Sequence, residues 1–323
     1  MKSENKIFSE LSPDCLHNEE AAYAYVEKHV WPDGPICPHC KGQDRISKMN
    51  GKSTRIGLYK CYRCRKPFTV KIGTIFESSH IPLHLWLQAM FLMASSKKGI
   101  SSLQLERTLG LTYKSAWFMS HRIREAMRSG ELAVPFGGGG GSVEVDETFI
   151  GRGPGMEVKR AYHHKMKVLA LVDRSSRQVK SVVVDDLKPT TIAPILNQNM
   201  AAEAKLLTDE STIYNKIGKN YAAHDRVNHN KGEYVSYSNP EVHTNTIEGY
   251  FSIFKRGMKG IYQHCGKQHL HRYCAEFDFR YNYRIALGVD DHARALVMLK
   301  SVSGKRLTYR AIGPKRDQAD TKA

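Results

Sequence analysis

The sequence lacks any apolar run approaching the roughly 18 consecutive residues that a membrane span needs. Its first residues, MKSENKIFSELSPD, also lack the apolar core of a secretory signal peptide. These absences exclude an integral membrane protein and a protein exported by such a signal. We therefore expect a cytoplasmic protein, whose seven cysteines act as thiols or metal ligands and do not form disulfides.

Acidic residues are scarce relative to basic ones. The 323 residues include 49 Lys and Arg against 32 Asp and Glu, a formal net charge of +17. Such a surplus is typical of proteins that bind a polyanion, nucleic acid above all, although some soluble cationic proteins bind none. Hydrophobic residues make up 41% of the chain, so we expect most of it to fold, in two or three domains.

Four cysteines form two CxxC pairs, Cys37 with Cys40 and Cys61 with Cys64. Two such turns can complete a closed Cys₄ zinc site, and metal binding supplies folding free energy that so small a module cannot draw from its core. We predict a structural zinc ribbon in a first domain, residues 1–75, which begins with a helix. Several basic residues surround the ribbon, and they either contact a polyanion or form an ordinary solvated surface: Lys41, Arg45, Lys48, Arg63, Arg65 and Lys66.

A second metal site near the C-terminus is a weaker hypothesis. Cys265 and Cys274 lie close in sequence to three histidines, His264, His269 and His271. On a helix, however, Cys274 is more simply explained as a small buried hydrophobic residue.

Residues 76–135 have the periodicity of helices. PLHLWLQAMFLMAS predicts one buried helix, SSLQLERTLG a second, and TYKSAWFMSHRIREAM a third. The last two, joined by a turn containing Gly110, are typical of a helix-turn-helix, in which the second helix enters the major groove; a hairpin that only packs is the alternative. The predicted DNA contacts are Tyr113, Lys114, Ser115 and Arg122, and the predicted buried face is Trp117, Phe118 and Ile123.

Five consecutive glycines at 137–141 suggest a flexible linker over residues 136–142. They do not form a phosphate-binding loop, because no Gly-Lys-Ser/Thr follows them. Beyond them, strand patterns such as SVEVDETFIG and KVLALVD alternate with helix patterns such as TNTIEGYFSIFKRGM. We predict an α/β domain over 143–312 and a disordered tail over 313–323.

Three acids in this domain are candidates for a divalent-metal site. Asp146 lies in an otherwise apolar strand, on the same face as Glu144; Asp209 ends a buried strand; Glu248 begins a helix. Carboxylates that converge from distant segments can hold two metal ions, and hard oxygen ligands select Mg²⁺ or Mn²⁺. Each acid alone could also be a helix cap or a surface ion pair. Five further acids compete for the role: Glu147, Asp173, Asp185, Asp186 and Glu210.

Several long motifs resemble, in order and spacing, the catalytic domain of bacterial insertion-sequence transposases of the DDE class. They are VEVDETFIG, LLTDES, VNHNKGEYV, HTNTIEGYFSIFKRGMKGIYQH and HLHRYCAEFDFRYN. The insertion sequence 1595 family is the most similar, because it also carries a zinc ribbon followed by KKGISSLQLERTLG-like residues. The resemblance covers roughly residues 15–312. It implies an RNase H-like mixed sheet flanked by helices, and metal-dependent hydrolysis at element ends followed by attack of the freed 3′-hydroxyl on target DNA.

The resemblance also implies roles for individual residues. Asp146 and Asp209 match the first two acids, and Lys255 matches a lysine that holds DNA phosphate, with Arg256 beside it. The family carries Asp-Asp-Asn-Lys or Asp-Asp-Glu-Lys signatures, so the third ligand is either Asn245 or Glu248. We favour Glu248, since a carboxylate binds a divalent ion better than an amide does. His229 and His243 are weaker candidates for residues that position the substrate.

The expected partners are double-stranded DNA, as element ends and target, and further copies of this chain; a nucleoid location follows. Two other functions remain open. One is a catalytically inactive repressor that binds the same ends, and the other is an RNase H-like nuclease that does not join strands. The complete set of acids argues against the first, and the ribbon with its helix-turn-helix argues against the second.

Overall fold

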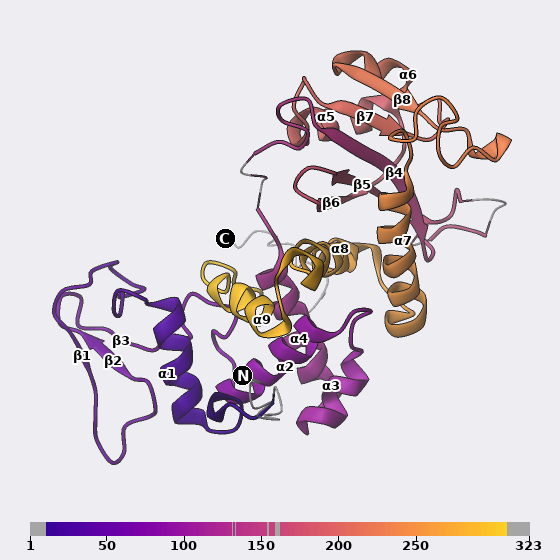
Figure 1. Ribbon diagram of the computed structural model, residues 1–323. Coiled ribbons are helices and arrows are strands. Elements are labelled where there is room, and N and C mark those ends of the chain that lie inside the picture. Colours follow the sequence, from indigo (N-terminus) through magenta and orange to yellow (C-terminus); the bar gives the residue numbers. More distant parts are fainter. Residues whose placement is uncertain (1–10, 131, 133, 154, 159–161, 309–323) are drawn as a thin grey trace, which may run out of the picture.

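The computed structural model describes residues 11–308, except 131, 133, 154 and 159–161. Two parts are visible in Figure 1, an N-terminal part of ribbon and helices and a part built on a five-stranded sheet. The predicted tail at 313–323 lies outside the described residues. No described helix combines the length and apolarity needed to cross a bilayer.

The N-terminal part begins with a short helical turn and a capped helix, followed by a three-stranded antiparallel sheet. Asn18 caps the first helix by accepting a hydrogen bond from the Ala21 backbone N–H. The elements are α1 (Glu19–Val30), β1 (Ile46–Lys48), β2 (Tyr59–Cys61) and β3 (Pro67–Phe68).

Three helices follow as the sequence predicts: α2 (Leu83–Ser95), α3 (Ser102–Leu109) and α4 (Tyr113–Met127). Gly110 ends α3 with a left-handed backbone at φ 65°, which glycine adopts without strain. Thr112 then starts α4 by accepting from the Ser115 backbone N–H. The sequence analysis did not predict α9 (Asp291–Lys300), which packs back against α2 and buries Met298 and Leu299 in the core of the N-terminal part. Helix α9 therefore belongs to the N-terminal part, although it follows the five-stranded sheet in the sequence.

The larger sheet has the order β6-β5-β4-β7-β8. β4 and β5, and β5 and β6, pair antiparallel, whereas β4 and β7, and β7 and β8, pair parallel. Its strands are β4 (Ser142–Ile150), β5 (Met166–Asp173), β6 (Gln178–Val184), β7 (Lys205–Thr208) and β8 (Ala223–Arg226). The structure is thus mixed α/β, with its long central strands at β4 and β5.

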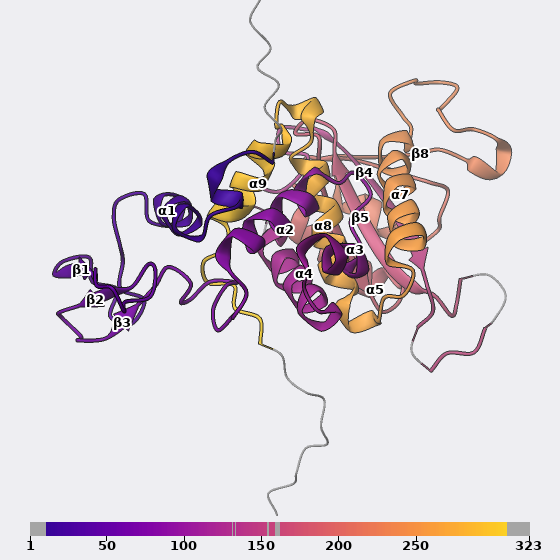
Figure 2. The same cartoon turned by 90° about the horizontal axis from the view of Figure 1, so that it is seen from below.

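Helices cover both faces of this sheet, as Figure 2 shows for α7, α8 and α5. Val168, Ala170 and Val172 of β5 pack in the cluster with α7 and α8, whereas Leu169 and Leu171 pack in the cluster with α5 and α6. A strand buried on both sides reads as a continuous apolar run, which explains KVLALVD. The helices are α5 (Pro189–Asn199), α6 (Tyr214–Ile217), α7 (Asn245–Gly257) and α8 (Lys267–Asn282).

The prediction of a flexible, unanchored linker at 136–142 is wrong. Phe136 is buried in the core beneath the sheet and its backbone N–H donates to Asn199 O. The glycines form a hydrogen-bonded turn in which the Gly141 N–H donates to Gly137 O. Gly137 has φ 77°, and a Cβ there would lie 2.3 Å from the Cβ of Ala204. The glycines therefore serve a tight, closely packed turn.

Candidate functional site

The four predicted zinc ligands lie together. The Sγ atoms of Cys37 and Cys64 are 3.6 Å apart, those of Cys40 and Cys61 are 3.7 Å apart, and all four lie within 4.8 Å of one another. The backbone N–H of Cys64 helps to lower the pKa of the Cys61 thiol to about 7, whereas burial and the neighbouring thiols raise the pKa of Cys40 to about 11. Four thiols at this spacing fit a closed tetrahedral zinc site.

The two halves of this site have matching backbones. The residues directly after Cys40 and Cys64, Lys41 and Arg65, both have a left-handed backbone, with φ 61°. At Lys41 the turn closes when its N–H donates to Cys37 O. Both side chains are exposed, so a basic residue extends from each knuckle. Contact of these residues with a polyanion stays a prediction.

Some of the residues of α4 that were predicted to contact DNA are exposed, and others are buried. Tyr113 is 50% exposed and Lys114 is also exposed, so both are accessible, while Ser115 is half-buried. Arg122 was predicted to contact DNA, but it is buried: its Nη2 donates to Glu77 O and its guanidinium lies over the Trp86 ring. That prediction is wrong for this conformation, because the guanidinium joins α4 to the preceding segment.

The predicted buried face of α4 also needs correction. Ile123 is fully buried, but Trp117 and Phe118 are only half-buried. Ala116 and Met119 take their place in the core. The helix is therefore rotated slightly from the orientation predicted from its aromatic residues.

Asp146 and Asp209 occupy corresponding positions on neighbouring strands. In the parallel pair β4–β7, Val143 lies opposite Leu206 and Glu144 opposite Leu207. Continuing this register places Asp146 level with Asp209, the first residue after β7. Neighbouring strands are about 4.8 Å apart, and residues level in a parallel pair point to the same face. The sheet therefore brings the two acids together from 63 positions apart in the sequence (209 − 146).

Glu248 comes from the first turn of α7, which covers that same face. The N-terminal end of α7 is fixed to the sheet because the Ile247 backbone N–H donates to Glu144 Oε2 at 2.8 Å. Burial, together with the negative charges of Glu147, Asp209 and Glu248, raises the pKa of Asp146 to about 8. The three predicted acids thus share one electrostatic environment.

Glu147 is a fourth acid in this environment, which the sequence analysis ranked only as a competitor. Burial raises its pKa to about 7, and the charge of Asp209 adds to the shift. Its Oε1 accepts from the Tyr214 hydroxyl at 2.5 Å, which holds the carboxylate against α6. Within the described residues, the four cysteines form the one group of three or more His, Cys, Asp or Glu side chains placed closely enough to hold a metal ion, and these carboxylates do not form another. Hard oxygen donors on three elements fit Mg²⁺ or Mn²⁺ in kind.

His229 and His243 both lie beside this site. His229 Nδ1 is 3.4 Å from Glu248 Oε1 and its Nε2 is 3.2 Å from Thr244 Oγ1, so the ring orients the first turn of α7. His243 Nδ1 is 2.7 Å from Arg174 Nη2 and 3.6 Å from Glu144 Oε1. The ring therefore belongs to the contacts that hold the sheet to the loop before α7.

Arg174 and Glu144 lie beside the candidate site, and the sequence analysis missed the first and left the second without a role. Arg174 Nε donates to the fully buried Glu144 at 2.7 Å, and its Nη2 donates to His243 O at 2.9 Å. Arg174 thus ties the end of β5 to the start of α7. The alternation that placed Glu144 on the face of Asp146 was the one available signal.

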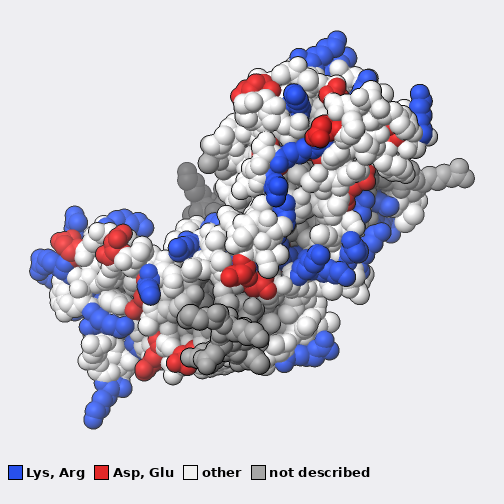
Figure 3. All heavy atoms as spheres, viewed as in Figure 1, with Lys and Arg blue, Asp and Glu red and all other residues white. Residues whose placement is uncertain are grey.

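The remaining candidate residues on α7 and in the loop after β6 differ in exposure and in their contacts. Asn245 and Lys255 are exposed on α7, and Lys255 Nζ lies 6.0 Å from the centre of the Phe251 ring. Arg256 donates to Ser252 Oγ of its own helix at 2.7 Å. Figure 3 shows Lys and Arg side chains gathered around α7 and around the ribbon. Asp185 and Asp186 lie in the loop that follows β6, where Asp186 accepts from the Thr191 hydroxyl.

The second metal site suggested by Cys265 and Cys274 does not form among the described residues. Cys274 is 2% exposed within the core of α7 and α8, as its simpler interpretation predicted. Cys265 donates only to the neighbouring Gly266 O. His269 contacts Arg272 instead, at 2.8 Å.

Stability without divalent metal should fall as pH rises from about 5 to about 9. The folded state keeps a proton on Glu147 up to about pH 7 and on Asp146 up to about pH 8, whereas the unfolded chain loses both near their ordinary values. The folded state then binds more protons in that window, so stability declines with pH. The midpoint of thermal unfolding, followed by circular dichroism, should fall by several degrees over this pH range. Each kcal/mol of lost stability lowers the midpoint by about 2–4 °C. An Asp146→Asn variant with an equally steep decline would contradict this explanation.

Comparison with known proteins finds matches over both parts of the chain. Residues 139–282 match the ISXO2-like transposase domain, and residues 17–67 match the transposase zinc-ribbon domain; both models describe the insertion sequence 1595 family. An uncharacterized protein in transposable element ISH50 of Halobacterium salinarum is 25% identical over 279 residues, which are 81% of this chain and 90% of that protein. A chain from a simian T-cell lymphotropic virus intasome in complex with a PP2A regulatory subunit matches at 12% identity and a TM-score of 0.28. The match covers 60% of this chain and 65% of that chain.

Proposed function

Because the chain belongs to the insertion sequence 1595 family of transposases, we propose that it recognises the ends of its element and cleaves and joins DNA there with Mg²⁺ or Mn²⁺. The observation that carries the proposal is the register of β4 and β7, which aligns Asp146 with Asp209 beneath Glu248 on α7. Bound divalent ions would activate the attacking oxygen and stabilise the leaving one.

The protein groups have distinct proposed roles. Asp146, Asp209 and Glu248 hold the metal ions through their carboxylates. Lys255 lies seven residues beyond Glu248, two helical turns along the same side of α7, where an exposed ammonium can bind a DNA phosphate. Arg256 adds a second cation there.

The sheet order and the paired helices support the finer parts of the proposal. Three antiparallel strands followed by two parallel ones, with the acids at the central strand, support an RNase H-like catalytic domain. The α3–turn–α4 arrangement, with exposed Tyr113 and Lys114 at the start of α4, supports a helix-turn-helix that reads the major groove. Its base contacts would come from the first turn alone, since Arg122 is buried.

Strand transfer by the purified protein tests the proposal directly. Labelled element-end DNA and an unlabelled target are incubated with Mg²⁺, and cut and joined products are separated on a denaturing gel. Joined products establish a transposase. Tight end binding without any cutting would favour the repressor, and cutting without joining would favour the nuclease.

The third metal ligand can be identified in the same assay. We expect Glu248→Gln to reduce cleavage on the order of 10²-fold or more, since it removes a carboxylate ligand. Asn245→Ala, one helical turn earlier, should have a much smaller effect, because Asn245 is exposed and only Glu248 adds charge to the site. The opposite ranking, with both variants folded, would assign the role to Asn245.

A further inference from the structure

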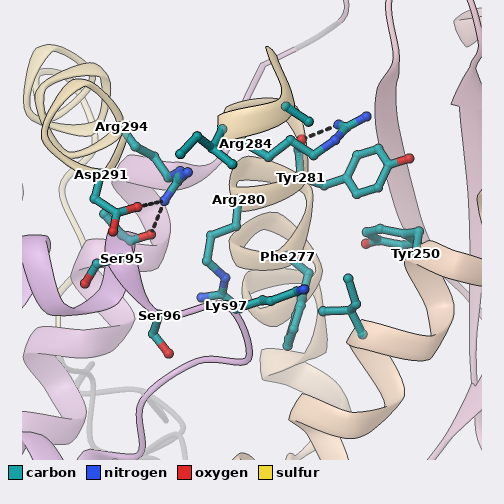
Figure 4. Close-up of a pocket in the computed structure, with 14 residues that line it drawn as sticks. Ser95, Ser96, Lys97, Tyr250, Phe277, Arg280, Tyr281, Arg284, Asp291 and Arg294 are labelled. Atoms are coloured by element: carbon teal, nitrogen blue, oxygen red, sulfur yellow. Dashed lines mark hydrogen bonds and ion pairs between the residues drawn. The ribbon is translucent and has the colours of Figure 1, made fainter. Parts of the chain in front are cut away.

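A cavity of about 490 Å³ lies between the two parts of the molecule. Residues 94–97 at the end of α2 line one side, and α7, α8 and α9 line the others (Figure 4). From α7 it is lined by Tyr250 and Ile253. At about 100° per residue, these lie on the opposite side of the helix from Glu248 and Lys255. The cavity is therefore separate from the proposed catalytic site.

A buried arginine with unused donors lines this cavity. Arg280 is 7% exposed, and its Nη1 donates to Glu276. Its Nε and Nη2 have no acceptor among the described residues. Figure 4 shows this side chain within the lining, between Ser96 and Phe277. A buried charged donor without an acceptor is costly, so an anionic group beside Arg280 would remove a penalty that the protein otherwise bears.

The rest of the lining is cationic and aromatic. Lys97 and Arg284 add two positive charges, and the Arg284 guanidinium lies 3.9 Å from the centre of the Tyr281 ring. Asp291 is the one acid of the lining, and Arg294 already pairs with it at 2.5 Å. Phe277 is only 3% exposed, and its ring lies 4.6 Å from the Arg280 guanidinium, so it backs Arg280 from the core. The cavity therefore combines an anion site with a flat aromatic surface.

We propose that this cavity binds a nucleotide, with its phosphate at Arg280 and its base against Tyr281. Arginine binds phosphate through paired N–H donors, and bases stack on aromatic rings and on guanidinium planes. The volume lies within the range of small-ligand pockets. The nucleotide is either a free one or one extruded from bound DNA. The second source rests on the proposed function, because it requires that the protein bind DNA. Because the cavity lies on the opposite side of α7 from the acids, the nucleotide bound there is not the one at which DNA is cut.

Occupancy of the cavity would couple the two parts of the protein. Glu276, which pairs with Arg280, also accepts from Arg124 Nε of α4 at 2.7 Å. Both arginines and Glu276 are buried, so a phosphate beside Arg280 acts on a network that reaches the proposed DNA-reading helix. A bound nucleotide also touches the end of α2 and α8 at once.

Calorimetric titration of the full chain with 2′-deoxyadenosine 5′-monophosphate, without divalent metal, tests the proposal. Deoxyadenosine, which lacks the phosphate, should bind at least about tenfold more weakly, since a charged hydrogen bond contributes about 1.5–3 kcal/mol. Arg280→Lys keeps the charge opposite Glu276 but removes the planar fork, and should weaken binding to a similar extent. Ala286→Trp, an exposed position on the rim, should block the cavity without touching the buried network. Lys300→Ala, an exposed cation on α9 outside the cavity, is the matched control.

A second titration distinguishes the two sources. A duplex with one unpaired 2-aminopurine nucleotide reports insertion by its fluorescence, and the monophosphate should compete with it if the DNA-borne nucleotide enters the cavity. Competition indicates an extruded nucleotide, and monophosphate binding without competition indicates a free one. Equal affinity for monophosphate and nucleoside, unchanged binding by Ala286→Trp, or no binding would each overturn the proposal. Nucleotide binding by a protein that never cuts DNA would instead overturn only the proposed function.

Discussion

Asp146→Asn should abolish metal-dependent cleavage and joining while leaving the protein folded and able to bind DNA. The carboxylate is level with Asp209 on the neighbouring strand and is close enough to Glu248 for that charge to raise its pKa, so its loss would remove one ligand of the proposed metal site. Losing several kcal/mol of transition-state stabilisation corresponds to a rate decrease on the order of 10³-fold or more. Single-turnover cleavage of labelled end DNA measures it.

Two further measurements make this result specific. Asp185→Asn changes an acid that pairs only with Lys267 at the surface, and it should leave the cleavage rate within about twofold. End binding by Asp146→Asn, measured by gel shift in EDTA, should match the native protein. Cleavage by Asp146→Asn at near-native rates would refute the metal-site assignment and with it the proposed mechanism.

Loss of zinc should unfold the ribbon and leave the sheet domain intact. The three strands β1, β2 and β3 are two or three residues long, and besides the cysteines only Phe68 is fully buried in the ribbon's cluster. So small a core cannot order the segment, whereas a structural zinc contributes about 10–16 kcal/mol. Cys61→Ser should therefore release the metal and abolish amide-exchange protection in residues 37–68.

The sheet domain provides the internal control for that experiment. Exchange protection in β4 and β5 should persist in Cys61→Ser, because the sheet's two hydrophobic clusters contain no residue of the ribbon. Cys15→Ser changes a cysteine outside the cluster and should keep one zinc per chain by atomic absorption. A Cys61→Ser protein that keeps zinc and a protected ribbon would contradict the four-cysteine assignment.

Local patterns predicted much of the structure. The CxxC spacing identified the four clustered thiols, and helical or alternating periodicity identified α2, α3, α4, α7, β4 and β5. These features depend on neighbours close in sequence, where spacing fixes geometry directly. The alternation of β4 also placed Glu144 and Asp146 on one face. It did not indicate that Glu144 would fix the start of α7.

Predictions failed where contacts between residues far apart in the sequence determine the structure. A run of five glycines has the composition of a linker, but Phe136 packs under the sheet and Gly137 meets Ala204, so the run is a tight turn. Arg122 has the charge of a DNA contact, but Glu77 O and Trp86 enclose it. Ala204 lies far in the sequence from the glycines, as Glu77 and Trp86 do from Arg122, so local patterns could not identify these contacts.

The sequence by itself determined the chemistry that this protein has available: four thiols for zinc, carboxylates for divalent ions, and a basic surplus for a polyanion. Only the tertiary structure decided which of those groups meet. The parallel register of β4 and β7 aligned Asp146 with Asp209, and Glu144 with Arg174 set α7 above them. Closing the chain around α9 created the cavity at Arg280. Side-chain type and short-range spacing are local properties, whereas register, burial and charge proximity arise from packing between segments that are far apart in the chain.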